Sequence, residues 1–474
     1  MRWNRRSGRK SHWTSQERWY SKRGFCWGFN SEVLSACLRG HTPQYANGIY
    51  LCGFSGHAQC YRFACRLLAC LASFTPFAQR GCKLMSAKDR TAFLDSLRNL
   101  KMARSPQAYI RGTTKLFYEW LDRRSSSIPD GPAVWICGDC HLGNLGALAD
   151  RDGDVAVQIR DFDQTVIGNP AHDLIRLGLS LASAARDSDL PGVTTARTLE
   201  ALVAGYGAAT VESEASTPHL RQPKDIRKLL KHSVRRRWRN LAMENFQTKR
   251  PVLPRDRRFW PLHRKERSAV LSLCKETELQ EIVLGFEKAR PDNWKVLDAA
   301  YWIKGCSSLG RLRCAALVRD GKHGPVSLLD IKEAASATAP SASGARMPRD
   351  YAERVITGAK ALSPNLGDRA VATRMMNKAV FIREITPQDM KIEIDRLAGD
   401  EIQAMARYLG GVVGHAHGRQ MDGQEWRSWT AELGRARMEK PDAPSWLWSS
   451  VVELLSIHDQ AYLEHCRRFA SAQH

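Results

Sequence analysis

The segment VWICGDCHLGNLGAL, residues 134–148, restricts the folds open to this chain because it carries two incompatible signatures. Residues 137–141 have the C-x-x-C-H spacing of a site for covalent haem attachment. Asp139 and Asn144, five residues apart, instead have the spacing of a phosphotransfer loop, in which one residue orients the attacking hydroxyl and the other binds magnesium. The segment serves one of these purposes at most.

The rest of the chain favours the second signature. Haem c is attached in exported proteins, whereas the N-terminal MRWNRR is not followed by the apolar core of a signal peptide. We therefore expect no haem and a cytoplasmic, reducing compartment in which the 13 cysteines remain unpaired. The longest apolar run of the N-terminal head, roughly residues 67–78, is too short to span a bilayer, so we also expect no membrane insertion.

Residues 1–85 form a basic head whose composition differs from that of the remaining sequence. They hold thirteen Lys and Arg against two Glu, and seven of the 13 cysteines, in a chain of 474 residues with a net charge of +23. No apolar periodicity organises this head. Two interpretations stay open, a disordered basic tail or a natural translation start at Met85. A zinc site is disfavoured because the head has no paired C-x-x-C units.

A predicted hairpin brings a second acidic motif toward the first. Residues 155–159 alternate as in a half-buried strand, and the Asp-Gly pair at 152–153 is a hairpin turn signal. This strand leads into Asp161, which the hairpin would place beside Asp139 and Asn144. Asp161 and Asn144 are candidate Mg²⁺ ligands, because Mg²⁺ prefers hard oxygen donors, and Asp139 would stay free to accept a proton. Each acid alone is more typical of a turn cap, but their order across one hairpin favours a site.

The pattern after the hairpin indicates a helix. Apolar residues between 174 and 182 recur at helical spacing, and Asp173 begins this stretch. An Asp at this place is typical of a helix N-cap, which accepts hydrogen bonds from the first free backbone N–H groups. Asp173 could also fix the backbone of the loop that contains Asp139.

Several short motifs resemble those of known families. The pattern GDCHLGN…IRDFD…GNPAHDL resembles the catalytic segment of aminoglycoside and choline phosphotransferases of the protein-kinase-like superfamily, with Cys137 in place of the first His of their HGDxHxxN loop. The motifs SPQAYIRG, GDCHLGNLG, RDFDQ and HDLIRLGLSL are similar to those of an uncharacterised bacterial family, domain of unknown function 2252. This similarity runs from about residue 90 to the C-terminus.

The resemblance implies roles for the acidic residues and two cofactors. Asp139 takes the place of the catalytic base, and His141 and Asp163 complete the expected catalytic set. Asn144 and Asp161 take the places of the metal ligands. The implied cofactors are ATP, or another nucleoside triphosphate, and Mg²⁺.

A kinase-like enzyme also needs a glycine-rich turn over the phosphates and a strand lysine. The sequence upstream of Asp139 offers neither, but the downstream segment WIKGCSSLGRLRCAALV holds a cluster of small residues. They are Gly305, Ser307, Ser308 and Gly310. Such a turn alone is also typical of an ordinary hairpin. Lys332 follows near the end of an apolar strand, as in the lysine strand of kinases, and Glu353, in a predicted helix over 351–362, is its candidate ion-pair partner.

The order of these parts predicts an α+β, two-lobed, protein-kinase-like fold that is circularly permuted. A predicted strand over 378–385 and a predicted helix over 399–421 should lead directly to the catalytic loop, yet that loop lies near the start of the chain. Permutation is tolerated where chain termini lie close together at the surface. The alternative is a pair of separate domains, which would place Lys332 and Asp161 in different cores.

Four segments follow from this assignment. They are the basic extension at 1–85, a catalytic lower-lobe segment at 86–290, a nucleotide-binding segment at 291–392, and helices at 393–474 that return to the lower lobe. The second contains a basic insertion at 221–267 whose aromatic residues are Trp238, Phe246, Phe259 and Trp260. Such a mixture can bind nucleic acid, but we prefer a solvated helical insertion whose aromatic side chains pack on the core.

The expected function is phosphoryl transfer from ATP to an unidentified, small-molecule acceptor. Transfer of the nucleotide instead of the phosphate stays open, because a fold does not fix its chemistry. The alternative from a different class is a catalytically silent nucleotide-binding or regulatory protein whose basic surface holds an anionic partner.

Overall fold

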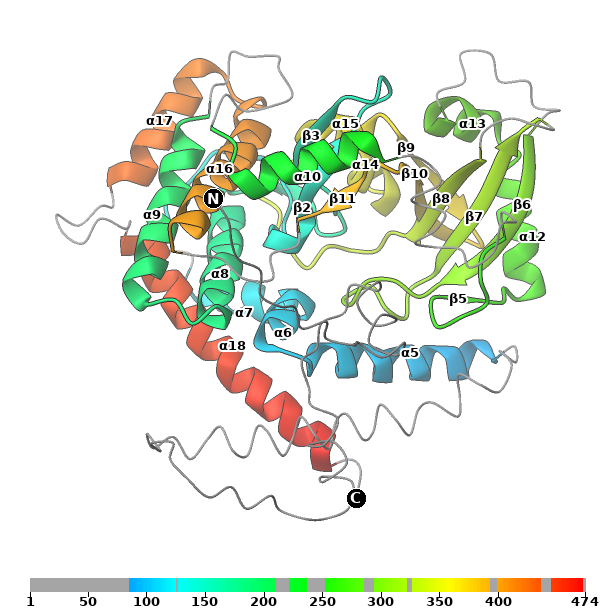
Figure 1. Ribbon diagram of the computed structural model, residues 1–474, viewed down its shortest axis with the longest axis horizontal. Coiled ribbons are helices and arrows are strands. Elements are labelled where there is room, and N and C mark those ends of the chain that lie inside the picture. The colour runs from blue at the N-terminus through cyan, green and yellow to red at the C-terminus, as the bar shows by residue number, and fades with distance from the viewer. Residues whose placement is uncertain are drawn as a thin grey trace, which may run out of the picture. The chain divides into compact units, whose positions relative to one another are not determined.

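The computed structural model describes residues 85–124, 127–209, 221–236, 252–284, 294–321, 326–392, 399–435 and 445–471. All of them belong to one compact unit, Ala69–His474. The predictions made for residues 1–84, and for Trp238 and Phe246, lie outside the described residues. Figure 1 shows how the described helices and strands are arranged.

The loop that contains Asp139 lies between short strands of two small sheets. β1 (Val134–Ile136) pairs antiparallel with β4 (Val166–Gly168), and the acidic hairpin lies between them in the sequence. β2 (Leu145–Ala149) and β3 (Val155–Ile159) form that hairpin, whose turn contains a glycine with a φ of 89°. The predicted hairpin and the bounds of its second strand are therefore confirmed.

A six-stranded antiparallel sheet carries the predicted lysine strand, and its order is β5-β6-β7-β8-β10-β9. The strands are β5 (Phe259–Trp260), β6 (Trp294–Trp302), β7 (Arg313–Asp320), β8 (Val326–Glu333), β9 (Ala370–Met375) and β10 (Lys378–Ile385). Lys332 lies near the end of β8, opposite Arg313 of β7 and Phe381 of β10. The strand predicted over 378–385 is β10, with the predicted bounds.

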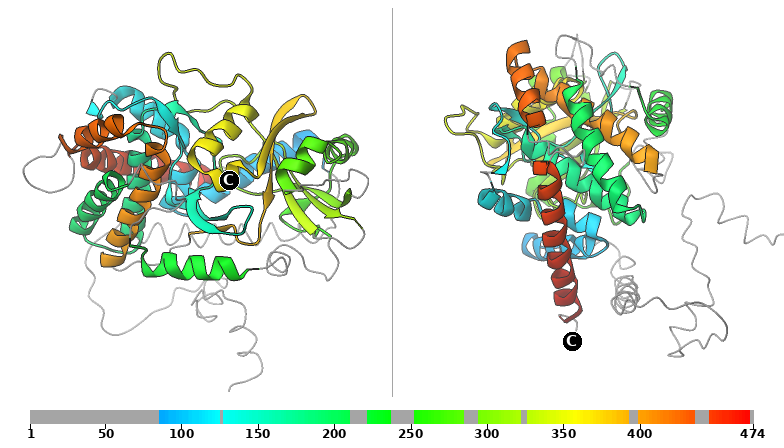
Figure 2. Two further views of the ribbon diagram at one scale, coloured as in Figure 1. Left: turned by 90° about the horizontal axis from the view of Figure 1, so that it is seen from above. Right: turned by 90° about the vertical axis from the view of Figure 1, so that its left-hand side faces the viewer.

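Helix α14 (Tyr351–Leu362) joins the lysine strand to the far edge of this sheet and has the bounds predicted from periodicity. The side chain of Asp350 caps the helix by accepting hydrogen bonds from the backbone N–H groups of its first turn. The helix packs against β9 and β10 and also contacts β1 (Figure 2). A four-residue helix, α15 (Pro364–Gly367), follows it. Through α14 the large sheet therefore contacts the strand that precedes the Asp139 loop.

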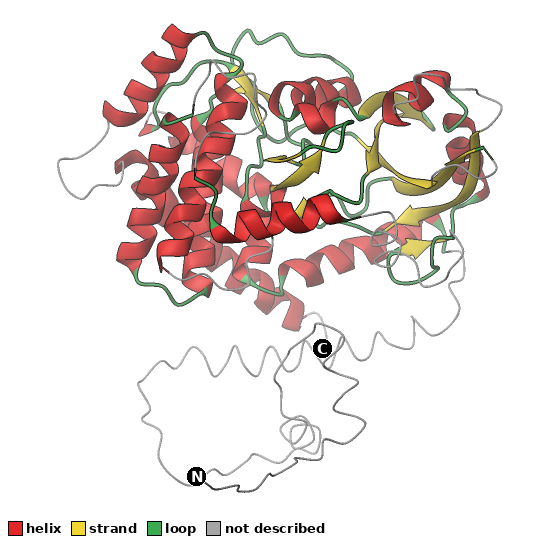
Figure 3. Cartoon of the chain, turned by 45° about the horizontal axis from the view of Figure 1, so that its top comes forward, coloured by secondary structure: helices red, strands yellow, loops and turns green. Residues whose placement is uncertain are grey.

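Helices gather beside the strands (Figure 3), and one of them contacts both β1 and β3. They are α8 (Ala171–Asp187), α9 (Gly192–Gly207), α16 (Gly399–Gly418), α17 (Gly423–Arg435) and α18 (Ser445–Ser471). Every residue of α8 from Asp173 to Ala185 is buried, because α9, α16 and α18 all pack against it. The helix predicted over 399–421 is α16, which ends three residues earlier.

The first described helices connect the two parts of this arrangement. They are α5 (Ala87–Met102), α6 (Pro106–Gly112) and α7 (Thr114–Arg124). Arg90 of α5 donates a 3.1 Å hydrogen bond to Glu266 of α12 (Arg264–Leu273), and α12 and α13 (Thr277–Leu284) pack on the large sheet. Lys101 donates to the carbonyl oxygen of Gly305 at 2.9 Å. Residues assigned from sequence to the catalytic segment thus contribute to the surroundings of the large sheet.

The described part of the basic insertion packs on the protein. Helix α10 (Lys224–Arg235) buries Ile226, and Phe259 stacks on Trp302 with ring centroids 5.4 Å apart. The ring of Trp260 lies 5.2 Å from that of Phe93. These contacts agree with the preferred interpretation, in which the aromatic residues pack on the core. No helix among the described residues has the length and apolar character needed to cross a membrane.

Helices α9 and α16 approach each other so closely that several positions along the contact require glycine. A Cβ atom on Gly205 would lie 1.9 Å from the carbonyl oxygen of Arg407, and one on Gly410 would lie 2.1 Å from that of Leu202. Both obstacles are backbone atoms, so a rotamer change cannot relieve them. The position of α16 relative to α8 and α9 therefore depends on these two glycines.

We expect Gly410→Ala to lower the free energy of unfolding by about 3 kcal/mol, because the helices must separate to admit the methyl group. Gly192→Ala is the matched control, since nothing lies within 4 Å of a Cβ atom there. That change should alter stability by less than about 1 kcal/mol. Urea unfolding of both variants measures the difference, and equal losses would contradict this account of the helix contact.

Candidate functional site

The first turn of α8 fixes the backbone of the Asp139 loop. The Asp173 carboxylate accepts hydrogen bonds from the backbone N–H groups of Cys137, at 2.7 Å, and Gly138, at 3.0 Å. Gly138 has a φ of 72°, a conformation that favours glycine. The helix begins at Ala171, two residues before Asp173. The N-cap interpretation of Asp173 is therefore wrong, and the interpretation that it fixes the loop is confirmed.

A buried polar chain extends from Asp173 into the helices. His417 Nε2, from α16, lies 3.2 Å from the Asp173 carboxylate, and His417 Nδ1 lies 3.1 Å from the Tyr206 hydroxyl of α9. Trp429 of α17 donates to the same hydroxyl at 3.0 Å. Because buried polar groups are costly when they lack partners, this chain fixes the orientation of Asp173. Three helices thereby position the loop.

The two cysteines of the C-x-x-C-H pattern are packing residues. Cys137 and Cys140 are fully buried in the core, and the Cys137 thiol donates to the carbonyl oxygen of Asp161 at 3.4 Å. The neighbouring Cys140 thiol and burial hold the pKa of Cys137 well above its usual range. Both thiols are therefore enclosed side chains of the core.

Asp139, the candidate base, is engaged on both carboxylate oxygens. Arg176 of α8 donates to one oxygen at 2.8 Å, and the Thr114 hydroxyl donates to the other at 3.0 Å. Arg176 also donates to the carbonyl oxygen of Ile110 at 2.7 Å. Asn144 donates to the backbone carbonyl of Asp139 at 2.9 Å, so the two ends of the loop are tied together. The arrangement fixes the orientation of the Asp139 carboxylate.

His141 follows in the same loop and is 4% exposed. Burial, together with the positive charges of Arg111 and Arg176, lowers the pKa of His141 to about 4, although Asp139 acts in the opposite direction. The imidazole is therefore neutral at pH 7. Its Nδ1 atom is buried and has no hydrogen-bond partner within the described residues. His141 lies beside Asp139 as the sequence implies, and any part it takes in chemistry is that of a neutral group.

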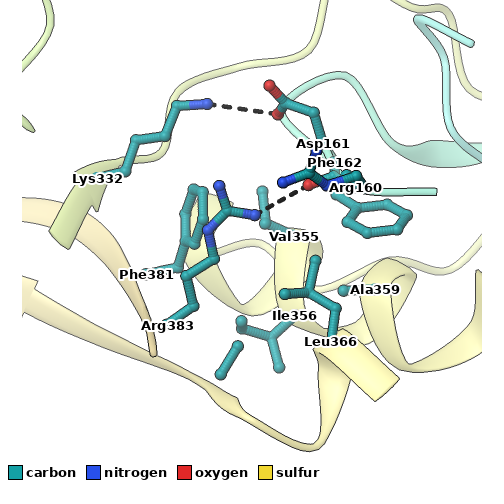
Figure 4. Close-up of a pocket in the computed structure, with 11 residues that line it drawn as sticks. Arg160, Asp161, Phe162, Lys332, Val355, Ile356, Ala359, Leu366, Phe381 and Arg383 are labelled. Atoms are coloured by element: carbon teal, nitrogen blue, oxygen red, sulfur yellow. Dashed lines mark hydrogen bonds and ion pairs between the residues drawn. The ribbon is translucent and has the colours of Figure 1, made fainter. Parts of the chain in front are cut away.

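Asp161 and Lys332 meet at the turn that follows β3 (Figure 4). Asp163, in the same turn, also contacts Lys332. The Lys332 ammonium lies 3.3 Å from Asp161 Oδ1 and 2.6 Å from Asp163 Oδ2. The lysine side chain is 4% exposed, whereas that of Asp161 is 43% exposed. The lysine strand and the acidic hairpin thus have the proximity that the sequence analysis required, within one compact unit.

The two carboxylates have opposite protonation tendencies. Burial raises the pKa of Asp163, and the negative charge of Asp161 adds to this effect. Burial acts in the same direction on Asp161, but the positive charges of Lys332 and Arg383 outweigh it and hold the pKa of Asp161 below its usual range. Asp161 is consequently the more reliable anion of the pair and the better candidate for binding a cation.

Glu353 does not have the expected contact with Lys332. It is exposed on the first turn of α14, where its backbone N–H is capped by Asp350. The next residue, Arg354, is the buried one, and it donates to the carbonyl oxygens of Asp163, at 3.1 Å, and Ala335, at 2.8 Å. The helix therefore supports the acidic turn through Arg354. The predicted ion pair between Lys332 and Glu353 is wrong, because Lys332 pairs with Asp161 and Asp163 instead.

The small residues predicted to contact phosphates form the connection between β6 and β7. Gly305 and Gly310 have φ angles of 89° and 96°, so both positions require glycine-like backbone freedom. Ser307 is exposed and Ser308 is buried. The turn ends beside the lysine strand, where the backbone N–H of Glu333 donates to the carbonyl oxygen of residue 312 at 2.9 Å.

The residues present fit a magnesium ion that also binds phosphates. No cluster of three or more His, Cys, Asp or Glu side chains suited to a metal occurs among the residues that the structure describes. Mg²⁺, however, commonly takes one or two carboxylates and completes its shell with phosphates and water. Asp161 is accessible, and Asp163 Oδ1 is buried with no hydrogen-bond partner in the described part of the chain. A bound cation would give this carboxylate oxygen the partner that it lacks.

A small pocket opens below the acidic turn, between α14 and β10 (Figure 4). Its polar side is formed by Arg160, Asp161, Lys332 and Arg383. Its apolar side includes Val355, Ile356 and Phe381. Arg383 donates to the carbonyl oxygen of Arg160 at 2.9 Å, which links β10 to the residue that precedes Asp161.

Several arginines around the site were not assigned from sequence. Arg313 donates to the buried Asp330 of β8 at 2.8 Å, and Arg383 contacts the same carboxylate at 3.3 Å. Arg176 and Arg111 belong to the motifs HDLIRLGLSL and SPQAYIRG, so the motif matches held a signal for them. Asp330 and Arg383 lie in strands whose pattern gave no such signal.

Comparison with known protein families gives one match. The model of the family described as "Uncharacterized protein conserved in bacteria (DUF2252)" matches residues 90–468. No curated protein and no solved structure matches the chain. The match covers most of the sequence and includes all the site residues described above.

We expect Asp173→Asn to lower the free energy of unfolding by about 3 kcal/mol, because an amide cannot accept both loop hydrogen bonds and leaves buried donors unpaired. Asp122→Asn, an exposed position near the end of α7, is the control and should change stability by less than about 0.5 kcal/mol. Urea unfolding followed by tryptophan fluorescence measures both. Indistinguishable midpoints would remove Asp173 from its role in fixing the loop.

Proposed function

The chain belongs to the bacterial DUF2252 family, and we propose that it is a kinase-like phosphotransferase that moves a phosphoryl group from ATP to an acceptor. One observation carries the proposal. Lys332 of the large sheet lies 3.3 Å from Asp161 of the acidic hairpin, although the two residues are 171 positions apart in the sequence. A strand lysine beside a metal-binding Asp is the pairing that phosphoryl transfer from a nucleotide needs.

The order of elements around Lys332 supports the proposal. The glycine-containing turn joins β6 to β7, Lys332 lies on β8, and α14 precedes β9 and β10. Kinase-like enzymes have a glycine-rich turn, a lysine strand and a helix in the same succession. Helix α16 follows and contacts β1, whose end leads into the Asp139 loop, although that loop comes earlier in the chain. This succession is what a circularly permuted kinase-like fold would have.

The site residues then take separate parts. Asp161 and Asn144 would hold Mg²⁺, with Asp163 beside them, and the ion would neutralise charge on the phosphates. Lys332 would exchange part of its contact with the carboxylates for contact with phosphate oxygens. The turn from Gly305 to Gly310 would bring backbone close to the same phosphates.

Asp139 would orient the acceptor hydroxyl. Its bond to Arg176 fixes its orientation, and phosphoryl transfer has a loose transition state in which positioning matters more than proton removal. The same bond favours the second candidate, a catalytically silent nucleotide-binding protein, because a carboxylate with both oxygens engaged can be purely structural.

We expect Mg²⁺–ATP to stabilise the wild-type protein against thermal unfolding, by about 2.7 kcal/mol at a ligand concentration of 100 Kd. Asp161→Asn and Lys332→Met should lose most of this stabilisation, because each removes a contact to the metal or the phosphates. Asp154→Asn, an exposed change at the tip of the same hairpin, should retain it. Thermal shift with and without EDTA measures the effect, and equal stabilisation of all variants would place the nucleotide elsewhere.

Turnover separates the two candidate functions. Formation of ADP from ATP across a panel of hydroxyl-bearing acceptors, abolished in Asp161→Asn and reduced at least about 100-fold in Asp139→Asn, is the expected result for a phosphotransferase. Binding without any turnover would favour the silent protein. Undiminished turnover in Asp139→Asn would remove Asp139 from the mechanism.

A further inference from the structure

Three cationic side chains lie near the acidic turn and the Asp139 loop. They are Arg111 of α6, Arg160 at the end of β3, and Lys391 of β11 (Met390–Lys391). They come from three parts of the chain, and none of them forms an ion pair with another described residue. Proteins rarely collect like charges without compensation, because each cation then raises the cost of the others.

Arg160 is the least exposed member of this group. Its Nε and Nη1 atoms are buried and have no hydrogen-bond partner within the described ranges. Buried N–H groups that lack an acceptor cost free energy, and a ligand that supplies the acceptors removes this cost.

The backbone brings Lys391 to Arg160. β11 pairs with β2, so that Lys391 lies opposite Gly146, and a Cβ atom on Gly146 would lie 2.8 Å from Arg160 Cδ. Loss of hydration, together with the positive charges of Arg160 and Arg111, lowers the pKa of Lys391 to about 8. The effect of both arginines on the lysine places the three cations within electrostatic reach of one another.

Arg111, the third member of the group, lies beside the Asp139 loop. A Cβ atom on Gly143 would lie 2.8 Å from Arg111 Nη2, so the guanidinium rests on the residue that precedes Asn144. Arg111 is exposed, and no hydrogen bond links its guanidinium to the described protein. The guanidinium is planar, its N–H groups are free to donate, and the loop holds it in place. Such a group is well suited to bind phosphate oxygens.

We propose that Arg111, Arg160 and Lys391 form a binding site for a phosphate group, or an equivalent dianion, next to the Asp161–Lys332 contact. The ordinary interpretation of such charges is a solvated surface, and it accounts for Arg111 and Lys391 taken singly. It does not account for the buried N–H groups of Arg160 that lack acceptors, in a side chain that packs, like Lys391, against Gly146. A dianion would supply the missing acceptors and offset the mutual repulsion.

The inference deepens the proposed function and rests on it for its place in the reaction, because it names a ligand class for the same site. The phosphate has two sources, the donor nucleotide itself or a phosphorylated acceptor. Binding of the bare anion needs neither Mg²⁺ nor turnover, so it can be tested on its own.

The test uses isothermal titration calorimetry of the full chain with pyrophosphate in buffer containing EDTA. We expect saturable binding to the wild type, weakened at least about tenfold in Arg111→Gln and in Lys391→Gln, since each loses a charge-assisted contact. Lys115→Gln is the matched control, because it removes one positive charge from a side chain that is 80% exposed on α7. All three positions are exposed, and circular dichroism checks that the variants fold.

Absence of pyrophosphate binding, or equal affinity in all four proteins, would overturn the proposal. If Mg²⁺–ATP stabilises the protein in the same preparation, only this inference fails and the proposed function stands. Where pyrophosphate binds as expected, a second titration with Mg²⁺–ATP identifies the source. Simultaneous binding assigns the site to a phosphorylated acceptor, and mutual exclusion assigns it to the phosphates of the nucleotide.

Discussion

A buried lysine ammonium between two carboxylates holds the two halves of the candidate site together. The Lys332 side chain is 4% exposed, and a charge removed from water to this extent needs an opposite charge nearby. Asp161 and Asp163 provide it from a turn that lies far earlier in the chain. This contact therefore links the large sheet to the acidic hairpin, and the helices fix the Asp139 loop in the same part of the protein.

The local elements of the site could be predicted because short-range rules determine them. The alternation along β3 and the Asp-Gly turn before it depend only on neighbouring residues, and so do the periodicity of α14 and the apolar run of β10. All three elements have the bounds that the sequence indicated. The proximity of Lys332 to Asp161 could be predicted only by adding a family resemblance, since no periodicity connects segments so far apart.

Long-range partners could not be predicted, because they depend on which face of an element is buried. Successive helix residues point about 100° apart, so a shift of one position along α14 exchanges the exposed Glu353 for the buried Arg354. The sequence contained both residues and gave no means of choosing between them. Asp139 gives a second example. Its spacing from Asn144 could be read from the sequence, but its hydrogen bond with Arg176 depends on how α8 packs.

The contact between Asp139 and Arg176 bears on how this loop would act in the proposed function. Arg176 and Thr114 each engage one oxygen of the carboxylate, so the orientation of Asp139 is fixed. The Asp173 contacts hold the backbone of the same loop. A loose transition state for phosphoryl transfer requires positioning of the acceptor above all. Arg176, Thr114 and Asp173 would therefore serve phosphoryl transfer as positioning residues.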